Sequence, residues 1–240
     1  MVISDAVRTL EQELREVFGS RLQSLVIYGA RASHAPAAHG HDAPPTHTLA
    51  IVDAMTADDL RGCAGRIDAW HAAGLATPLL IASHEFEQSL DAFPLEFGAI
   101  LADHAIVAGA NPFASLAVDP ADLRRACEVQ ARSHLLHLRE GYLETRGNGG
   151  ALAVLIVRSA AAFAALVNSI ARLQGHESDD AASAARHVER LLGTAGSAVA
   201  EVVTLAGAHD ISSADAERLF APYLDAVERI VRYVDGWSAQ

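Results

Sequence analysis

The sequence contains little cysteine and no excess of positive charge, and both shortages restrict what the protein can be. Only two cysteines occur, Cys63 and Cys127, and they form no CxxC pair. We therefore expect small core residues in a reducing compartment, not a disulfide framework. Asp and Glu outnumber Lys and Arg by 30 to 18, which gives a net charge of −12. Because this charge repels phosphate backbones, nucleic acid is disfavoured as a partner.

Signals for export and for membrane insertion are also missing. The N-terminal helix-like stretch has no basic start followed by an uninterrupted apolar run, so we expect a cytoplasmic protein. The most apolar segment, residues 151–173, is interrupted by Arg158 and Asn168. It therefore predicts a buried bundle helix and no membrane span. The sequence also has no glycine-rich phosphate loop, Ser-His-Asp set or dinucleotide fingerprint.

The first half of the chain alternates short apolar runs with helical periodicity. Ser4 and Gly19 bracket a predicted helix, and Thr56 with Asp59 forms a capping box for another helix that should run to about Ala73. Alternating strands and helices indicate an α/β sheet. The predicted strands are residues 22–28, 49–52, 77–82 and 105–108.

The second half is predicted to be helical throughout, beginning at Asp119-Pro120, where an N-cap precedes a proline. Apolar stripes and short turns indicate an antiparallel helical bundle. We therefore predict a mixed α+β protein with domains at 1–117 and 118–240. The expected helices are 120–143, 151–173, 179–192, 197–205 and a last one capped at Ser212 or Ser213. The first should bury Leu123, Cys127, Leu135, Leu138 and Tyr142, and the last Leu219, Tyr223, Val227, Ile230 and Val234.

One stretch carries a family pattern. A strand ends in Tyr28-Gly29-Ala30-Arg31-Ala32, a long loop follows, and a second apolar strand contains Leu49-Ala50-Ile51-Val52. This order resembles the polymerase-beta-like nucleotidyltransferase superfamily, and the helical half resembles the bundles appended to many bacterial members. The resemblance implies a small twisted mixed sheet. It also implies that Gly29, Ala30 and Arg31 form a vestigial nucleotide-binding turn, with alanine in place of the family serine.

The resemblance fails where the family binds its metal. Members carry Asp-x-Asp at the start of the second strand and a third carboxylate on a later strand, and these hold divalent ions on a nucleoside triphosphate. Here Thr46 and Thr48 occupy the two aspartate positions, and the strand at residues 77–82 has no carboxylate. A threonine hydroxyl supplies neither the charge nor the affinity that magnesium requires. We therefore expect a catalytically impaired protein that uses no metal or cofactor.

Two other functions stay open. An active nucleotidyltransferase would use magnesium and a nucleoside triphosphate, and would modify a small-molecule or protein hydroxyl. It requires Asp42, Asp53 or Glu96 to converge near Gly29. A regulatory, antitoxin-like protein would instead bind a partner, which rests on analogy alone. A nucleotide is a candidate ligand in any of these, and the helical domain is expected to mediate contacts, including those of a homo-oligomer.

Three further patterns have ordinary explanations. The histidines of the long loop, His34, His39, His41 and His47, resemble metal ligands, but their spacing follows no structural zinc pattern, so solvated side chains are favoured. Arg132 and His137 are spaced as in the motif of HEPN-type ribonucleases, yet side chains five residues apart on a helix lie on different faces. An ordinary surface helix is therefore favoured. Arg158, expected inside an apolar helix, requires a carboxylate partner or a bound anion in an interdomain cleft.

Overall fold

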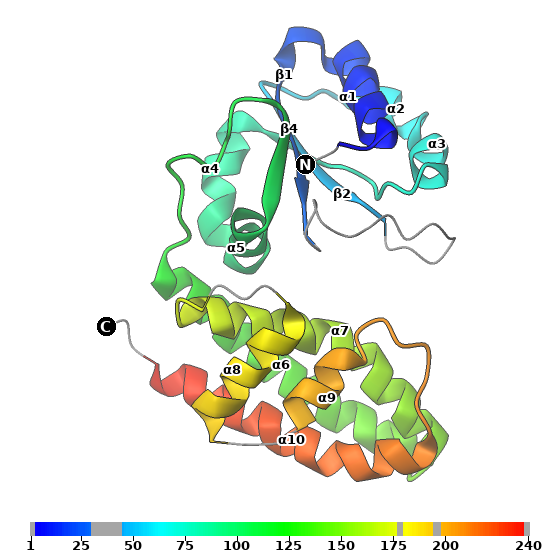
Figure 1. The fold of residues 1–240 in the computed structure, drawn as a ribbon, viewed down its shortest axis with the longest axis vertical. Helices are drawn as coiled ribbons and strands as arrows, with labels where there is room; N and C mark the ends of the chain where they lie inside the picture. The colour runs from blue at the N-terminus through cyan, green and yellow to red at the C-terminus, as the bar shows by residue number, and fades with distance from the viewer. Residues whose placement is uncertain (1–2, 30–44, 177–179, 194–197, 238–240) are drawn as a thin grey trace. The chain divides into compact units, whose positions relative to one another are not determined.

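The computed structural model describes residues 3–29, 45–176, 180–193 and 198–237. The chain divides into two compact units, Met1–Val118 and Asp119–Gln240. The first unit contains all four described strands and the second is helical, as Figure 1 shows. The predicted mixed α+β class is confirmed, with a small mixed sheet followed by a helical unit.

The sheet of the first unit is built around its first strand. The strand order is β3-β2-β1-β4, so β1 occupies a central position. β1 pairs antiparallel with both β2 and β4, whereas β2 and β3 are parallel. The prediction of β1 at residues 22–28 is confirmed, and β2 begins two residues before its predicted start. The strands are β1 (Leu22–Tyr28), β2 (His47–Val52), β3 (Leu79–Ala82) and β4 (His104–Gly109).

Helices cover both faces of this sheet because strand side chains alternate between its two sides. Leu25, Ile27, Ala50 and Val52 pack in one apolar cluster with residues of α1, α2 and α3. Val26, Leu49 and Ile51 pack in a second cluster with residues of α4 and α5. The helices are α1 (Asp5–Phe18), α2 (Ala57–Ala64), α3 (Ile67–Ala72), α4 (Ser83–Ala92) and α5 (Pro94–Ala102), with a 3₁₀ turn at Gly19–Arg21.

The prediction of a single helix from Thr56 to Ala73 is wrong. This segment forms two helices, with α2 ending before Gly65 and α3 starting at Ile67. Apolar periodicity continues through this region, but glycine favours an interruption, because it loses more conformational entropy in a helix than any other residue. The break leaves Trp70 buried on α3, where its indole donates a hydrogen bond to Glu13 of α1.

The second unit packs its three long helices against one another. α6, α7 and α10 make mutual contacts, and α8 and α9 pack on α7. α6 and α7 approach closely at Gly141, where an added Cβ would lie 2.5 Å from a methyl of Leu155. The helices are α6 (Pro120–Thr145), α7 (Gly149–Leu173), α8 (Ala181–Leu192), α9 (Ala198–Thr204) and α10 (Ser213–Gly236).

The predicted buried stripes are right for α10 and partly wrong for α6. All five predicted residues of α10 are buried. On α6, Tyr142 is exposed and Leu135 only partly buried, whereas Ala131 and His134 are buried. Tyr142 instead stacks on Phe220 of α10, with ring centroids 4.2 Å apart. The sequence pattern did not predict that Ala131 and His134 belong to the core.

α7 is the helix of the described chain that is long and apolar enough to cross a bilayer. Length and composition alone are weak evidence, because the core helix of a soluble bundle has the same properties. Twelve of its residues are buried, including Ile156, Phe163 and Ile170. Arg158, expected to be buried, is exposed on the opposite side of α7. The premise that its charge needs a buried partner is therefore wrong.

A polar cluster lies inside the bundle. The Nε2 atom of His134 on α6 lies 2.6 Å from the hydroxyl of Tyr223 on α10, and that hydroxyl lies 3.1 Å from Oγ of Ser159 on α7. The His134 ring also stacks on Phe163, with centroids 5.6 Å apart. Burial lowers the pKa of His134 to about 4. The imidazole is therefore neutral in the folded protein at physiological pH.

This cluster predicts that acid destabilises the fold. An unfolded histidine binds a proton near pH 6.5, whereas folded His134 does so near pH 4, so stability falls as the pH drops through this window. Between pH 7.5 and 5 the loss from this residue is about 2 kcal/mol. Urea unfolding at both values checks it, and His134→Gln should remove most of this difference.

His137→Gln is the matched control, because His137 is exposed on the same helix. An equal pH dependence of stability in the wild type and the His134→Gln variant would contradict the assignment.

Candidate functional site

The end of β1 meets the beginnings of β2 and β4 at one edge of the sheet. The antiparallel register pairs Tyr28 with His47 on one side and with His104 on the other. Gly29 follows with φ of +74°, a conformation that glycine adopts without strain. Its N–H donates to the backbone carbonyl of Asp103 at 3.1 Å. This edge, which we call the glycine edge, is where the family pattern predicts a nucleotide.

Thr48 lies beside this edge but is closed to solvent. It pairs with Ile27 of β1, and strand alternation places it on the same face as Ala50 and Val52. Its exposed fraction is 1%, and its Oγ1 has no hydrogen-bond partner among the described residues. A buried hydroxyl without a partner is costly, so packing and not polarity determines the environment of position 48.

Thr46 is held by its backbone. Its N–H donates to the carbonyl of Gly74 at 2.9 Å, and its carbonyl accepts from the N–H of Ala76 at 2.9 Å. These bonds join the start of β2 to the connection between α3 and β3. The side chain is partly exposed. Position 46 is therefore open to solvent, whereas position 48 is not.

Acidic groups are scarce at the glycine edge. Of the strand ends that meet there, residues 28–29, 45–49, 75–79 and 102–105, only Asp103 carries a carboxylate. Within the described ranges, no three His, Cys, Asp or Glu side chains gather in a way that could hold a metal ion. The edge thus offers aromatic and hydroxyl groups in place of the paired negative charge that a divalent cation requires.

The carboxylates considered as substitutes lie elsewhere. Asp53 follows the last residue of β2 and donates its N–H to the carbonyl of Arg21, at the end of the sheet opposite Gly29. Glu96 is exposed in the first turn of α5, seven residues before Asp103. Asp42 lies outside the described residues. Asp53 is therefore not brought to the glycine edge.

Several predicted site residues cannot be placed. Ala30 and Arg31 of the expected nucleotide turn, and His34, His39 and His41 of the histidine loop, lie outside the described residues. His47 is described, and its ring packs on Tyr28 with centroids 5.7 Å apart. The Tyr28–His47 pair forms an aromatic surface next to Gly29.

Arg132 and His137 have separate surroundings on α6. Arg132 binds Asp235 of α10 through two hydrogen bonds of 2.7 and 2.8 Å and also contacts Glu128. His137 is exposed, with Glu140 at 3.4 Å. The arginine therefore forms part of a helix–helix contact, and the structure brings the two side chains to no common site.

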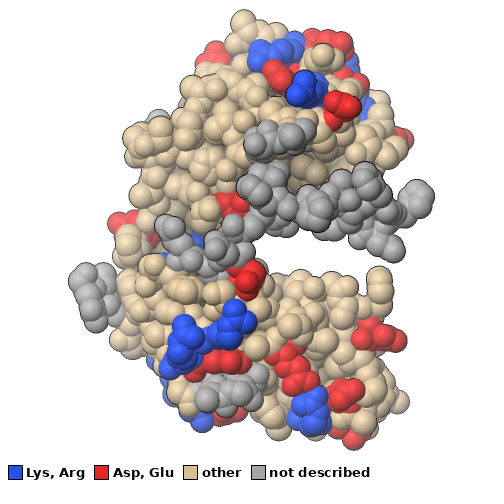
Figure 2. All heavy atoms as spheres, in the orientation of Figure 1, with Lys and Arg blue, Asp and Glu red and all other residues tan. Residues whose placement is uncertain are grey.

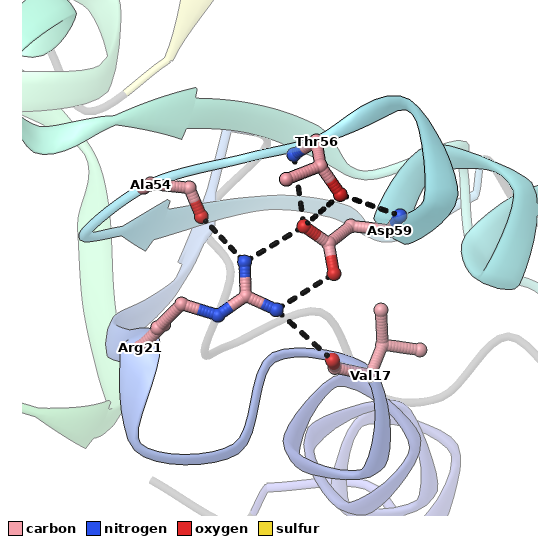
Figure 3. A network of polar contacts seen from close by, with 5 residues as sticks. All are labelled: Val17, Arg21, Ala54, Thr56 and Asp59. Carbon is pink, nitrogen blue, oxygen red and sulfur yellow. Dashed lines mark hydrogen bonds and ion pairs between the residues drawn. The ribbon is translucent and has the colours of Figure 1, made fainter.

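The most extensive polar network of the first unit is at the opposite end of the sheet from Gly29. Arg21 donates two hydrogen bonds of 2.7 Å to the two carboxylate oxygens of Asp59, as Figure 3 shows. Asp59 also accepts from the N–H and the hydroxyl of Thr56, both at 2.8 Å. Arg21 reaches the carbonyls of Ala54 and Val17 as well.

This network is structural. The Arg21 guanidinium and the Thr56 hydroxyl hold the pKa of Asp59 well below its usual range. The bonds tie the end of α1 to the start of α2 across 38 residues of sequence. The capping box between Thr56 and Asp59 was predictable, and both of its bonds form. Its arginine partner was not, because no local pattern connects it to α2.

Arg172 is a partly buried arginine of the second unit. The guanidinium donates to Oγ of Ser169 at 2.8 Å, and its Nε is buried without a partner in the described chain. Burial lowers its pKa. We expected Arg158 to be the buried arginine of α7, whereas Arg158 is exposed and Arg172 is partly buried.

Comparison with known proteins identifies the fold and no more. No protein-family model matches the sequence, and no curated protein sequence matches it. The fold is similar to that of a nucleotidyltransferase. One solved structure with this likeness is spectinomycin adenyltransferase AAD(9) from Enterococcus faecialis, determined with ATP and spectinomycin. The TM-score is 0.55 at 9% sequence identity, and the match covers 96% of this chain and 98% of the other. The chain thus has a nucleotidyltransferase-like fold over nearly its whole length.

Substitutions at the two threonines should differ in their effect on stability. Thr48→Val removes a buried hydroxyl without a partner and should stabilise the protein by up to about 1 kcal/mol. Thr48→Asp should destabilise it by about 2 to 4 kcal/mol at neutral pH, because a carboxylate would be buried without a counter-charge. Urea unfolding measures both.

Thr46→Asp is the control, since its side chain is partly exposed and the change should cost less than about 1 kcal/mol. Equal tolerance of aspartate at positions 46 and 48 would show that position 48 is open.

Loss of the Arg21–Asp59 contact should lower the melting temperature. Arg21→Ala leaves Asp59 without its counter-ion, and Asp59→Asn removes the charge that Arg21 requires. The double variant should fall less than the sum of the singles, because both changes remove one shared interaction. Thermal unfolding at pH 7 measures this. Because the pKa of folded Asp59 is depressed, the contribution is present above about pH 4 and lost as the pH falls below it.

The exposed ion pair of Arg61 and Asp58, on the same helix, supplies the control. Arg61→Ala should leave the melting temperature unchanged. Additive effects of the two single variants would disprove the coupling.

Proposed function

We propose that this chain is a nucleotidyltransferase-like protein that does not catalyse metal-dependent nucleotidyl transfer. Its function would instead be to bind a ligand, either a nucleotide or another protein chain. The observation that carries the proposal is Thr48, a sealed hydroxyl at a position where the resembling family has a metal-binding aspartate. The likeness to the adenyltransferase fold supports the ancestry of the scaffold, while the residues decide its chemistry.

The electrostatics of the glycine edge support this proposal. Two-metal transfer requires anionic oxygens on both sides of the reacting phosphate, because the metals stabilise the attacking and the leaving oxygen. Thr46 and Thr48 provide no charge, and Asp103 alone cannot supply the set. The residues present therefore do not fit a magnesium–triphosphate complex. The adenyltransferase was solved with ATP and spectinomycin, but neither ligand transfers to this chain on fold alone.

The active alternative needs an acidic side chain that reaches Gly29. Of the carboxylates it could use, Asp53 lies at the opposite end of β2, Glu96 lies in the first turn of α5, and Asp42 lies outside the described residues. A nucleotide at the glycine edge would instead meet the turn at Gly29 and the Tyr28–His47 rings. Such binding would depend on stacking and backbone contacts, so it would not require a divalent cation.

A transfer assay with matched calorimetry tests this proposal. The full-length protein is titrated with ATP and GTP in magnesium and again in EDTA, and incubated with radiolabelled triphosphates. We expect no transfer or triphosphate turnover, and any nucleotide affinity should change less than about twofold between the two conditions. An adenyltransferase of the same fold, with its acceptor, is the positive control.

Magnesium-dependent turnover, or nucleotide binding at least tenfold tighter with magnesium, would refute the proposal. Gly29→Val separates turnover by this chain from turnover by a contaminant, because a β-branched residue is strained at positive φ and should change the turn. Turnover that this variant abolishes, while circular dichroism shows that it stays folded, would belong to this chain.

A further inference from the structure

The outer side of α6 carries an unusual row of apolar side chains. Among the described residues, eight large apolar side chains are exposed, and four of them lie on α6. Val129, Leu136 and Leu143 have exposed fractions of 64%, 63% and 76%. They recur every seven residues, so they lie along one line on the helix. We call these three residues the α6 stripe.

The α6 stripe is on the side of the helix opposite the core. The buried residues of α6 include Cys127, His134 and Leu138. At 100° per residue, Leu136 points about 160° to 200° away from His134 and Leu138. α6 therefore has two apolar sides, one that packs in the bundle and one that the second unit leaves open. A surface helix of a soluble bundle needs only the first.

The two flanks of the stripe differ in charge. Arg132 and Arg139 lie on the flank next to α10, where they bind Asp235 and Glu228. Glu140 and Glu144 lie on the other flank, with side chains 76% and 77% exposed. Each guanidinium has five N–H donors, and Arg139 uses one of them for Glu228, so donors remain available. One edge of the stripe is thus acidic and the other presents guanidinium groups.

Other occupants fit this surface poorly. An anionic membrane or a nucleic acid would be repelled by the net charge of −12. The arginines beside the stripe also carry carboxylate partners. On a different face of the second unit, where α8 and α9 lie in front, Figure 2 shows acidic and basic side chains interspersed as well. A second copy of the chain fits this surface, because it presents the same apolar spacing and the same acidic and basic edges.

We propose that α6 pairs in parallel with α6 of a second copy, with Val129, Leu136 and Leu143 each beside its own counterpart. A seven-residue apolar spacing suits the left-handed crossing of two paired helices. In the parallel arrangement, the Glu140 edge of each copy meets the Arg132–Arg139 edge of the other, so both edges are matched. An antiparallel pair would place like edges together. The stripe spans about 21 Å along the helix.

Engineered disulfides test both the association and its direction. Cys63 and Cys127 are buried, so a cysteine placed on the stripe is the accessible thiol. Leu136→Cys and Leu143→Cys, each made alone in the full-length protein, should form disulfide-linked dimers on mild oxidation. Non-reducing electrophoresis and sedimentation velocity measure the product. Leu60→Cys, at an exposed position of α2, is the control and should form no disulfide-linked dimer.

The direction of pairing decides between the outcomes. A crosslink at position 136 and none at 143 would mean antiparallel helices and overturn the proposal. A wild-type protein that sediments as a monomer up to about 0.2 mM would overturn it as well. The double variant with Leu136→Glu and Leu143→Glu should raise the dissociation constant of the dimer at least tenfold, while Leu60→Glu should leave it unchanged. Because both stripe residues are exposed, circular dichroism should show unchanged helix content.

The transfer assay of the proposed function is independent of this result. A monomer without transfer activity would overturn the pairing alone, and a dimer with magnesium-dependent transfer would overturn the proposed function alone.

Discussion

The architecture of the first unit depends on the position of β1. This strand is hydrogen-bonded on both sides and buried on both faces, so its register determines what its neighbours present. Because β1 is antiparallel to β2 and β4, one sheet end collects Gly29, the start of β2 and the start of β4. The other end collects Arg21, Asp53 and the start of α2. The two ends have opposite characters, one aromatic and poorly charged, the other an ion-pair network.

Charged side chains are distributed unequally between the two ends of the sheet of the first unit. In a metal-dependent enzyme, carboxylates close together repel one another until a cation neutralises them. Here the start of β2 carries hydroxyls, and the only fully satisfied buried carboxylate network joins Asp59 to Arg21 and Thr56 in the part of the first unit that is described. Its role is to connect α1 with α2. This ion-pair network therefore stabilises the fold at the end of the sheet opposite Gly29.

Local patterns were sufficient for much of the fold. Ser4 and Gly19 bracket α1 as predicted, and the apolar run from Leu22 to Tyr28 is β1. These elements are determined by caps, turns and periodicity within a few residues. The break after α2 was missed because periodicity continued across Gly65. The assignment of Arg158 to the core failed because α7 is apolar on most sides, so composition did not reveal which side faces solvent.

The candidate site was predictable in its positions and not in its environment. Spacing placed Gly29 and Thr48 on successive strands, and the register shows Thr48 opposite Ile27. The burial of Thr48 is a tertiary property, as is the pairing of Arg21 with Asp59. Contacts of this kind follow from tertiary packing. No local motif encodes them.

The closed environment of Thr48 has an evolutionary consequence. When a catalytic position is merely substituted, one reverse mutation restores its function. When the surroundings have also closed around the new residue, the reverse mutation places a charge in an apolar interior and lowers fitness before any activity returns. Under the proposed function, recovery of metal binding would then require neighbouring residues to open first, so this arrangement would direct the lineage away from metal-dependent transfer.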